Sequence, residues 1–88
     1  MRWFNLIENT GSVPGSLGVS EERAKELLDK IKKMVGESWM RNQAKDIAAI
    51  SEWVTSPQEL ALSCYLYGCV ISDIKNADEH LKHAYNPN

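Results

Sequence analysis

Hydrophobic residues recur at helical spacing in three consecutive stretches of the chain, and the first lies near 20–35. Its apolar positions, three or four residues apart, are Ala24, Leu27, Leu28, Ile31, Met34 and Val35. The helix is expected to begin at Ser20, with Glu21 and Glu22 in its first turn where the helix dipole favours anions, and to end at Gly36 as a C-cap. We predict an amphipathic helix here, with its lysines (Lys30, Lys32 and Lys33) on a solvated face.

The second stretch, near 38–54, carries a stripe of apolar residues made of Met40, Ala44, Ile47, Ile50 and Val54. Trp39 and Trp53 fall on roughly one side of this predicted helix. Both tryptophans could pack at the edge of the core. Because tryptophan is enriched where proteins bind each other, they are also candidates for a partner-binding surface.

The third stretch, 57–84, opens with the S-x-x-E capping box of Ser56 and Glu59, and Pro57 suits the first helical position. The sequence then stays apolar almost without a break from Leu60 to Ile71. A helix that is apolar all round is buried on more than one side. We therefore predict a long third helix at the centre of the fold.

This third helix has two apolar faces, and each must be covered by other residues. The first two helices can shield one stripe, made of Leu60, Cys64, Tyr67, Ile71 and Ile74. The other face would then be an exposed patch, which monomeric proteins rarely keep. It consists of Leu62, Tyr65, Leu66, Cys69 and Val70. We predict that two copies meet there as a homodimer, although Trp3 and Phe4 of the N-terminal segment could cover part of it instead.

The predicted fold is all-α: a small three-helix bundle with a long central third helix and an irregular N-terminal arm. The arm and its loop occupy residues 1–19, since 9–18 is rich in Gly, Ser and Pro. The helical domain spans 20–85, and residues 86–88 form a tail. No stretch alternates apolar and polar residues as a strand would.

The composition of the chain limits the classes of function that it can have. The chain has 88 residues, enough for one small domain, and its formal net charge of −2 argues against a generic nucleic-acid or anionic-membrane binder. The apolar run is shorter than the ~20 residues that a membrane span needs. Cys64 and Cys69 lie five positions apart on one helix and cannot bridge, so we expect unpaired thiols in a reducing compartment, the cytoplasm.

No catalytic, cofactor or metal motif stands out, and we expect a protein that is not an enzyme and holds no cofactor. His80 and His83 could in principle clip one metal ion, but the sequence nominates no third ligand. Pairing either cysteine with these histidines would require the third helix to fold back on itself.

Residues 44–62 resemble a helix, a short turn and a helix, which is the layout of some DNA-binding motifs. However, the segment from Asp46 to Ile74 contains no Lys or Arg, and a recognition helix needs cations near phosphates. We therefore expect a non-enzymatic helical protein–protein interaction module: an adaptor, inhibitor or assembly protein. The alternative is a helical DNA-binding transcriptional regulator.

Overall fold

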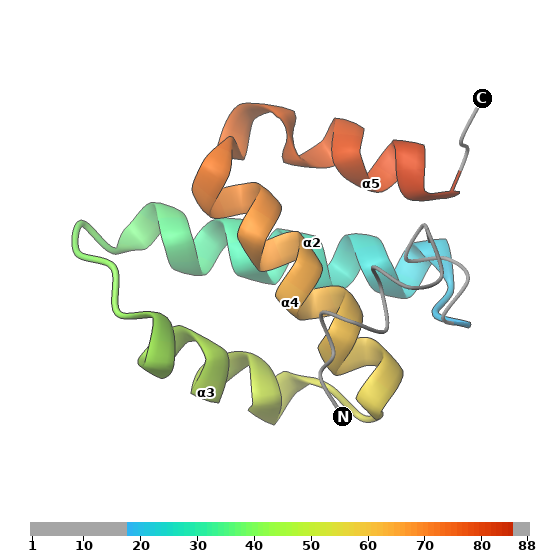
Figure 1. Cartoon of the computed structure of the whole chain (residues 1–88), viewed down its shortest axis with the longest axis horizontal. Coiled ribbons are helices and arrows are strands. Elements are labelled where there is room, and N and C mark those ends of the chain that lie inside the picture. The colour runs from blue at the N-terminus through green and yellow to red at the C-terminus, as the bar shows by residue number, and fades with distance from the viewer. Residues whose placement is uncertain (1–17, 86–88) are drawn as a thin grey trace.

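The computed structural model describes residues 18–85, and within them every regular element is helical (Figure 1). The four α-helices are α2 (Glu21–Glu37), α3 (Gln43–Trp53), α4 (Pro57–Ser72) and α5 (Ala77–Tyr85), and a short 3-10 helix, η2 (Ile74–Asn76), joins the last two. The all-α prediction is confirmed, whereas the three-helix count was wrong. Nearly all of the predicted arm, and the 86–88 tail, lie outside the described residues.

Helix α2 follows the prediction closely. The Ser20 side chain accepts a hydrogen bond from the Arg23 backbone N–H at 3.2 Å, as an N-cap should. The buried face is the predicted one, with Ala24, Leu27, Leu28 and Ile31 inside. Gly36 does not end the helix: it lies within the last turn, and Ser38 is the C-cap residue.

Helix α3 begins five residues later than predicted. Asn42 is its N-cap, and the Asn42 side chain accepts a hydrogen bond from the Lys45 N–H at 3.1 Å. The segment before it turns back on itself, because the Ser38 hydroxyl donates to the Met40 carbonyl at 2.6 Å. Trp39 and Met40 are therefore loop residues, and the predicted helical stripe that began at Met40 was wrong at that end.

The predicted third helix, 57–84, is two helices. Its start is confirmed, since Ser56 Oγ accepts from the Glu59 N–H at 3.1 Å and Pro57 occupies the first turn. The helix breaks at Asp73, whose backbone leaves the helical region (φ −160°, ψ 84°). The Asn76 amide donates to the Asp73 carboxylate at 2.6 Å. Asp and Asn side chains compete with the helical backbone in this way, and the apolar stripe gave no sign of it.

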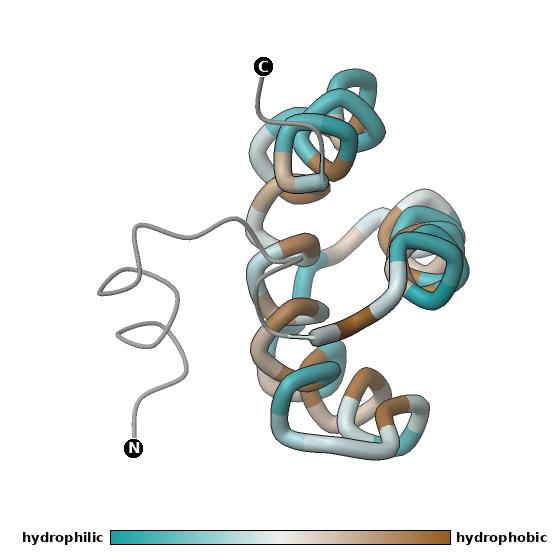
Figure 2. Tube along the Cα trace, turned by 90° about the vertical axis from the view of Figure 1, so that its right-hand side faces the viewer, coloured by the Kyte–Doolittle hydropathy of each residue, from teal (hydrophilic) through white to brown (hydrophobic). Residues whose placement is uncertain are grey.

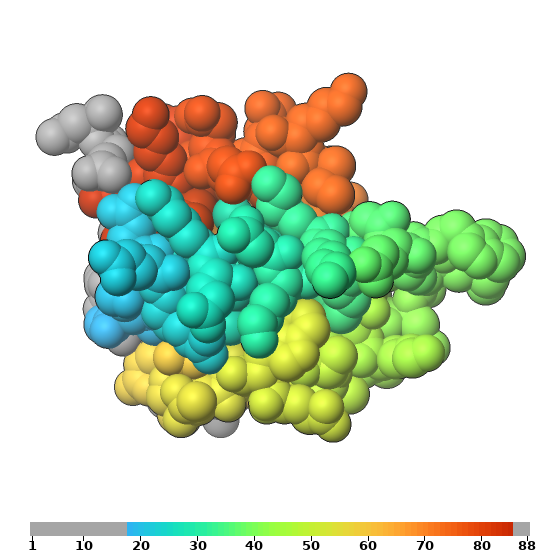
Figure 3. Space-filling view, turned by 180° about the vertical axis from the view of Figure 1, so that it is seen from behind, coloured from blue at the N-terminus to red at the C-terminus, as the bar shows by residue number. Residues whose placement is uncertain are grey.

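Helix α4 contacts each of the other α-helices of the described residues. It crosses α2, with α3 on one side of the molecule and α5 on the other, and Figure 2 shows α2 along one side of α4. The space-filling view from behind shows α2 running between α5 and the α3–α4 turn (Figure 3). After the break at Asp73, α5 folds back, and its Leu81 joins the core cluster that contains Leu28, Leu62 and Leu66.

The predicted assignment of the two faces of α4 was wrong in part. Leu62 and Leu66 are fully buried, and Val70 is 2% exposed, in one cluster with Leu28 and Ile31 of α2. These three residues are core, not a leftover surface. In the stripe that was expected to face the core, Tyr67 is buried, but Ile71 and the following Ile74 are exposed. A helix that is apolar all round offers two plausible faces, and periodicity alone does not choose between them.

One side chain ties three helices together near the α3–α4 turn. The Arg23 guanidinium of α2 donates to the Trp53 carbonyl at 2.9 Å and to Glu59 Oε1 at 3.1 and 3.2 Å. The same Glu59 oxygen accepts from the Thr55 N–H at 3.1 Å. The hydrogen bond from Arg23 lowers the pKa of Glu59 below its ordinary value.

None of the helices in residues 18–85 has both the length and the apolar content needed to cross a membrane.

Candidate partner-binding surface

The predicted partner-binding residues separate into three groups. Leu62, Leu66 and Val70 are buried, so they cannot contact a partner while the chain is folded. Tyr65 and Cys69 are half-buried on α4. The two tryptophans differ: Trp53 is half-buried against the core cluster, whereas Trp39 is 91% exposed. Of the seven predicted residues, Trp39 is therefore the one that is openly available.

The loop that carries Trp39 is held in place by several hydrogen bonds. In addition to the Ser38–Met40 contact, the Ser38 N–H donates to the Val35 carbonyl at 3.4 Å. Arg41 reaches the same carbonyl at 3.4 Å, and its Nε lies 3.1 Å from Asp46 Oδ2. The loop conformation is thus fixed from both helices that it joins. Trp39 lies in this hydrogen-bonded loop, outside both helices.

Asp46 is the buried anchor of the loop. It is 7% exposed and lies at the start of α3, where its carboxylate receives both Arg41 and the Tyr67 hydroxyl of α4, the latter at 2.6 Å. Burial and this hydrogen bond raise the pKa of Tyr67 to about 12. Since a buried carboxylate is costly unless it is paired and hydrogen-bonded, Asp46 is committed to holding the loop.

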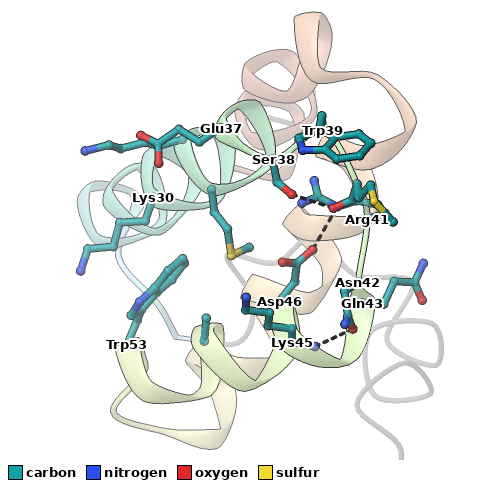
Figure 4. A pocket seen from close by; sticks show the side chains of 14 residues that line it. Lys30, Glu37, Ser38, Trp39, Arg41, Asn42, Gln43, Lys45, Asp46 and Trp53 are labelled. Atoms are coloured by element: carbon teal, nitrogen blue, oxygen red, sulfur yellow. Dashed lines mark hydrogen bonds and ion pairs between the residues drawn. The ribbon is translucent and has the colours of Figure 1, made fainter.

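An open groove of about 1140 Å³ lies between α2, the loop and α3 (Figure 4). Trp39 and Trp53 stand at opposite ends of it. Its apolar lining includes Met34, Met40 and Ala49. The Lys30 ammonium lies over the Trp53 ring, 5.6 Å from the ring centre, in a cation–π contact. The groove thus combines an apolar lining with a positively charged rim.

The charged side chains that line the groove are mainly basic. They are Lys30, Lys33, Arg41 and Lys45, against Glu37 and Asp46. Arg41 and Asp46 form a pair. Among residues 18–85, no ion pair involves the three remaining lysines. The groove is a locally positive site on a chain whose net charge is −2.

Exposed apolar residues continue on the far side of Arg41. A shallower hollow there is lined by Val35, Arg41, Ile71 and Ile74. Within the described chain the exposed large hydrophobic residues are Trp39 (91%), Met40 (62%), Ile71 (39%) and Ile74 (40%). Trp39 and Met40 line the groove, Ile71 and Ile74 line the hollow, and Arg41 lies between the two and lines both; we call these four hydrophobic residues the Trp39 patch. It lies where α2 and α4 both end.

The sequence did not nominate Met40, Ile71, Ile74, Lys33 or Lys45 as site residues. For the loop residue Met40, the signal that could have been used is Asn42. Asn is among the best N-cap residues, and placing the helix start there leaves Trp39 and Met40 in a loop. Ile71 is exposed because the Leu66 face of α4 packs against α2, and Ile74 follows the helix break at Asp73; the apolar periodicity encodes neither.

The candidate metal ligands and the two thiols lie apart from the groove lining. Among residues 18–85, no three His, Cys, Asp or Glu side chains come close enough together to hold a metal ion. Cys64 and Cys69 are both half-buried thiols, and burial raises the pKa of each above its ordinary value. A raised pKa lowers the thiolate fraction at neutral pH and therefore the reactivity of the sulfur.

Comparisons with protein-family models, with curated proteins and with solved structures find no match to this chain.

Proposed function

We propose that this chain is a non-enzymatic protein–protein interaction module whose working surface is the Trp39 patch and the adjoining groove. The observation that carries the proposal is the exposure of Trp39 in a loop that hydrogen bonds hold in place. Large contiguous exposed apolar areas commonly mark sites of protein association. Tryptophan is also the residue type most enriched among those that dominate binding energy.

Preorganisation supports the same conclusion. Binding is weakened when loops must be ordered on association, and a loop fixed beforehand avoids that loss. The Arg41–Asp46 pair and the Tyr67 hydrogen bond fix this loop from α4 as well as from α3. Met34 and Met40 add flexible, polarisable side chains that adapt to the shape of a partner.

An enzymatic role has less support in this groove. Its Ser38 hydroxyl donates to a backbone carbonyl, and its Asp46 carboxylate is occupied by Arg41 and Tyr67. An activated nucleophile needs a base within hydrogen-bond reach, and neither group is arranged in that way. The two free thiols fit a reducing compartment, so we propose a cytoplasmic location.

Our proposal places any contact between two copies on different residues from those that the sequence suggested. A homodimer built on Leu62, Leu66 and Val70 would require those core residues to leave the core. If two copies meet, we propose that they meet through the Trp39 patch. Light scattering at about 100 μM reports the association state, because a typical stable dimer dissociates far below that concentration.

The test is a partner-binding comparison between wild type and Trp39→Ala. Protein captured by the tagged wild-type chain from its source cells is identified and purified, and its dissociation constant is measured. We expect Trp39→Ala to weaken binding at least about 30-fold, or ~2 kcal/mol, because Trp39 would be a central contact. Since Trp39 does not pack in the core, the melting temperature of the Trp39→Ala variant should stay at the wild-type value.

The matched control is Lys82→Ala on α5, an exposed residue away from the groove, which should leave the dissociation constant unchanged. A partner that binds wild type and Trp39→Ala equally would contradict the proposal. Nucleic acid as the captured molecule would also contradict it, in favour of the DNA-binding alternative.

A further inference from the structure

We infer that the groove between α2 and α3 accepts an acidic amphipathic segment of the protein partner, with carboxylates against Lys30, Lys33 and Lys45. This inference rests on the proposed function and specifies the chemistry of the partner. The lysines come from both walls of the groove, two from α2 and one from α3. A segment lying along the groove would therefore meet positive charge on either side.

The apolar lining defines the other half of the partner. Met34 of α2 and Ala49 of α3 both line the groove, and Trp39 and Trp53 lie at its opposite ends (Figure 4). A segment with apolar residues on one face and carboxylates on its flanks would satisfy both parts. An amphipathic helix laid into a groove presents its side chains in this way, with apolar anchors three or four positions apart.

Two other occupants match the charge and the apolar lining of the groove less well. The chain's own residues 1–17 contain one basic and one acidic residue, Arg2 and Glu8, and so offer no excess of carboxylates. Nucleic acid would bring phosphates to the lysines, but its charged backbone offers no apolar face to the lining that includes Met34, Met40 and Ala49.

The experiment uses two fluorescent peptides of about 15 residues, stapled as helices and long enough to span ~22 Å at 1.5 Å per residue. Both carry leucine at every third or fourth position. One has glutamate at the flanking positions and the other has lysine. Anisotropy titrations with the full chain should show the acidic peptide binding at least about tenfold more tightly, with an affinity that falls as salt is added.

Charge reversal in the groove is the decisive variant. Lys33→Glu with Lys45→Glu should abolish or reverse the preference for the acidic peptide, since both side chains are exposed on the groove walls. Lys25→Glu with Lys82→Glu makes the same change in charge on the α2–α5 side of the molecule, and it should leave the preference intact. If the double glutamate variant is poorly folded by circular dichroism, Lys33→Gln with Lys45→Gln replaces it.

Each other outcome overturns the inference. A basic peptide that binds as well as the acidic one removes the charge argument, and so does an acidic peptide that is insensitive to Lys33 and Lys45. A single-stranded oligonucleotide that binds more tightly than either peptide assigns the lysines to phosphates. If neither peptide binds while a Trp39-dependent protein partner exists, this inference fails and the proposed function stands. If binding by any protein is independent of Trp39, the proposed function itself fails.

Discussion

Leu66→Glu should unfold the chain. Leu66 has no exposed surface and lies in the core cluster with Leu28 and Ile31 of α2. An unpaired carboxylate there costs several kcal/mol, which approaches the ~5 kcal/mol total stability expected of a small domain. Far-UV circular dichroism should show loss of most of the helical signal at 25 °C, and thermal scans should show no cooperative transition.

Ile71→Glu is the matched control, since it places the same charge on the same helix at a residue that is 39% exposed. It should remain folded, with a change in unfolding free energy within about 1 kcal/mol. A Leu66→Glu chain that is folded and monomeric, compared with a dimeric wild type, would contradict this account. That result would restore the α4 face as an interface between copies.

Arg23→Ala should produce the second large effect, a loss of about 2–3 kcal/mol of unfolding free energy, because hydrogen bonds to charged groups are each worth about 1.5–3 kcal/mol. The guanidinium joins α2 to the end of α3 and to the start of α4. Its partner Glu59 is nearly enclosed, with a side chain 14% exposed. Urea titrations of wild type and variant give the difference.

Lys25→Ala is the control for Arg23→Ala, on the same helix. The Lys25–Glu21 pair, at 3.6 Å, is largely in solvent, and such pairs contribute about 0–1 kcal/mol. An equal loss in both variants would mean that the Arg23 contacts add nothing beyond helix propensity. Arg23→Lys should recover only part of the stability, because lysine keeps the charge and loses the planar fork.

The same pair predicts a pH dependence. Glu59 has a lower pKa in the folded chain than in the unfolded chain. Its stabilising contribution is therefore present above the ordinary glutamate pKa of about 4.3 and is lost as the pH falls through the lower folded value. Arg23→Ala should flatten the loss of stability on acidification in this range, which would appear as a smaller difference between wild type and variant at low pH.

Local signals in the sequence predicted much of the fold. The apolar stripe of α2 gave its buried face correctly, and the capping residue Ser56 gave the start of α4, because an N-cap acts through its own backbone neighbourhood. The ends of the helices were harder to predict from the sequence. The break at Asp73 depends on a side-chain hydrogen bond with Asn76 that competes with an otherwise continuous apolar pattern.

The site was harder to predict than the fold, because it depends on which face of α4 meets α2. Both faces are apolar, so the choice between Leu66 and Ile71 as the buried residue is made by packing across the bundle. Trp39 was recognised as a candidate through its residue type alone. The groove beside it joins residues of α2 and α3 through a loop that is held by Asp46, a residue to which the sequence pattern assigned no role.

The most direct test of the central claim compares a photo-crosslinking amino acid at position 39 with the same amino acid at position 65. Position 39 lies at the Trp39 patch, and position 65 lies on the α4 face that the sequence first suggested. This account predicts a covalent adduct with the protein partner from position 39 and none from position 65. An adduct from position 65 without one from position 39 would contradict it.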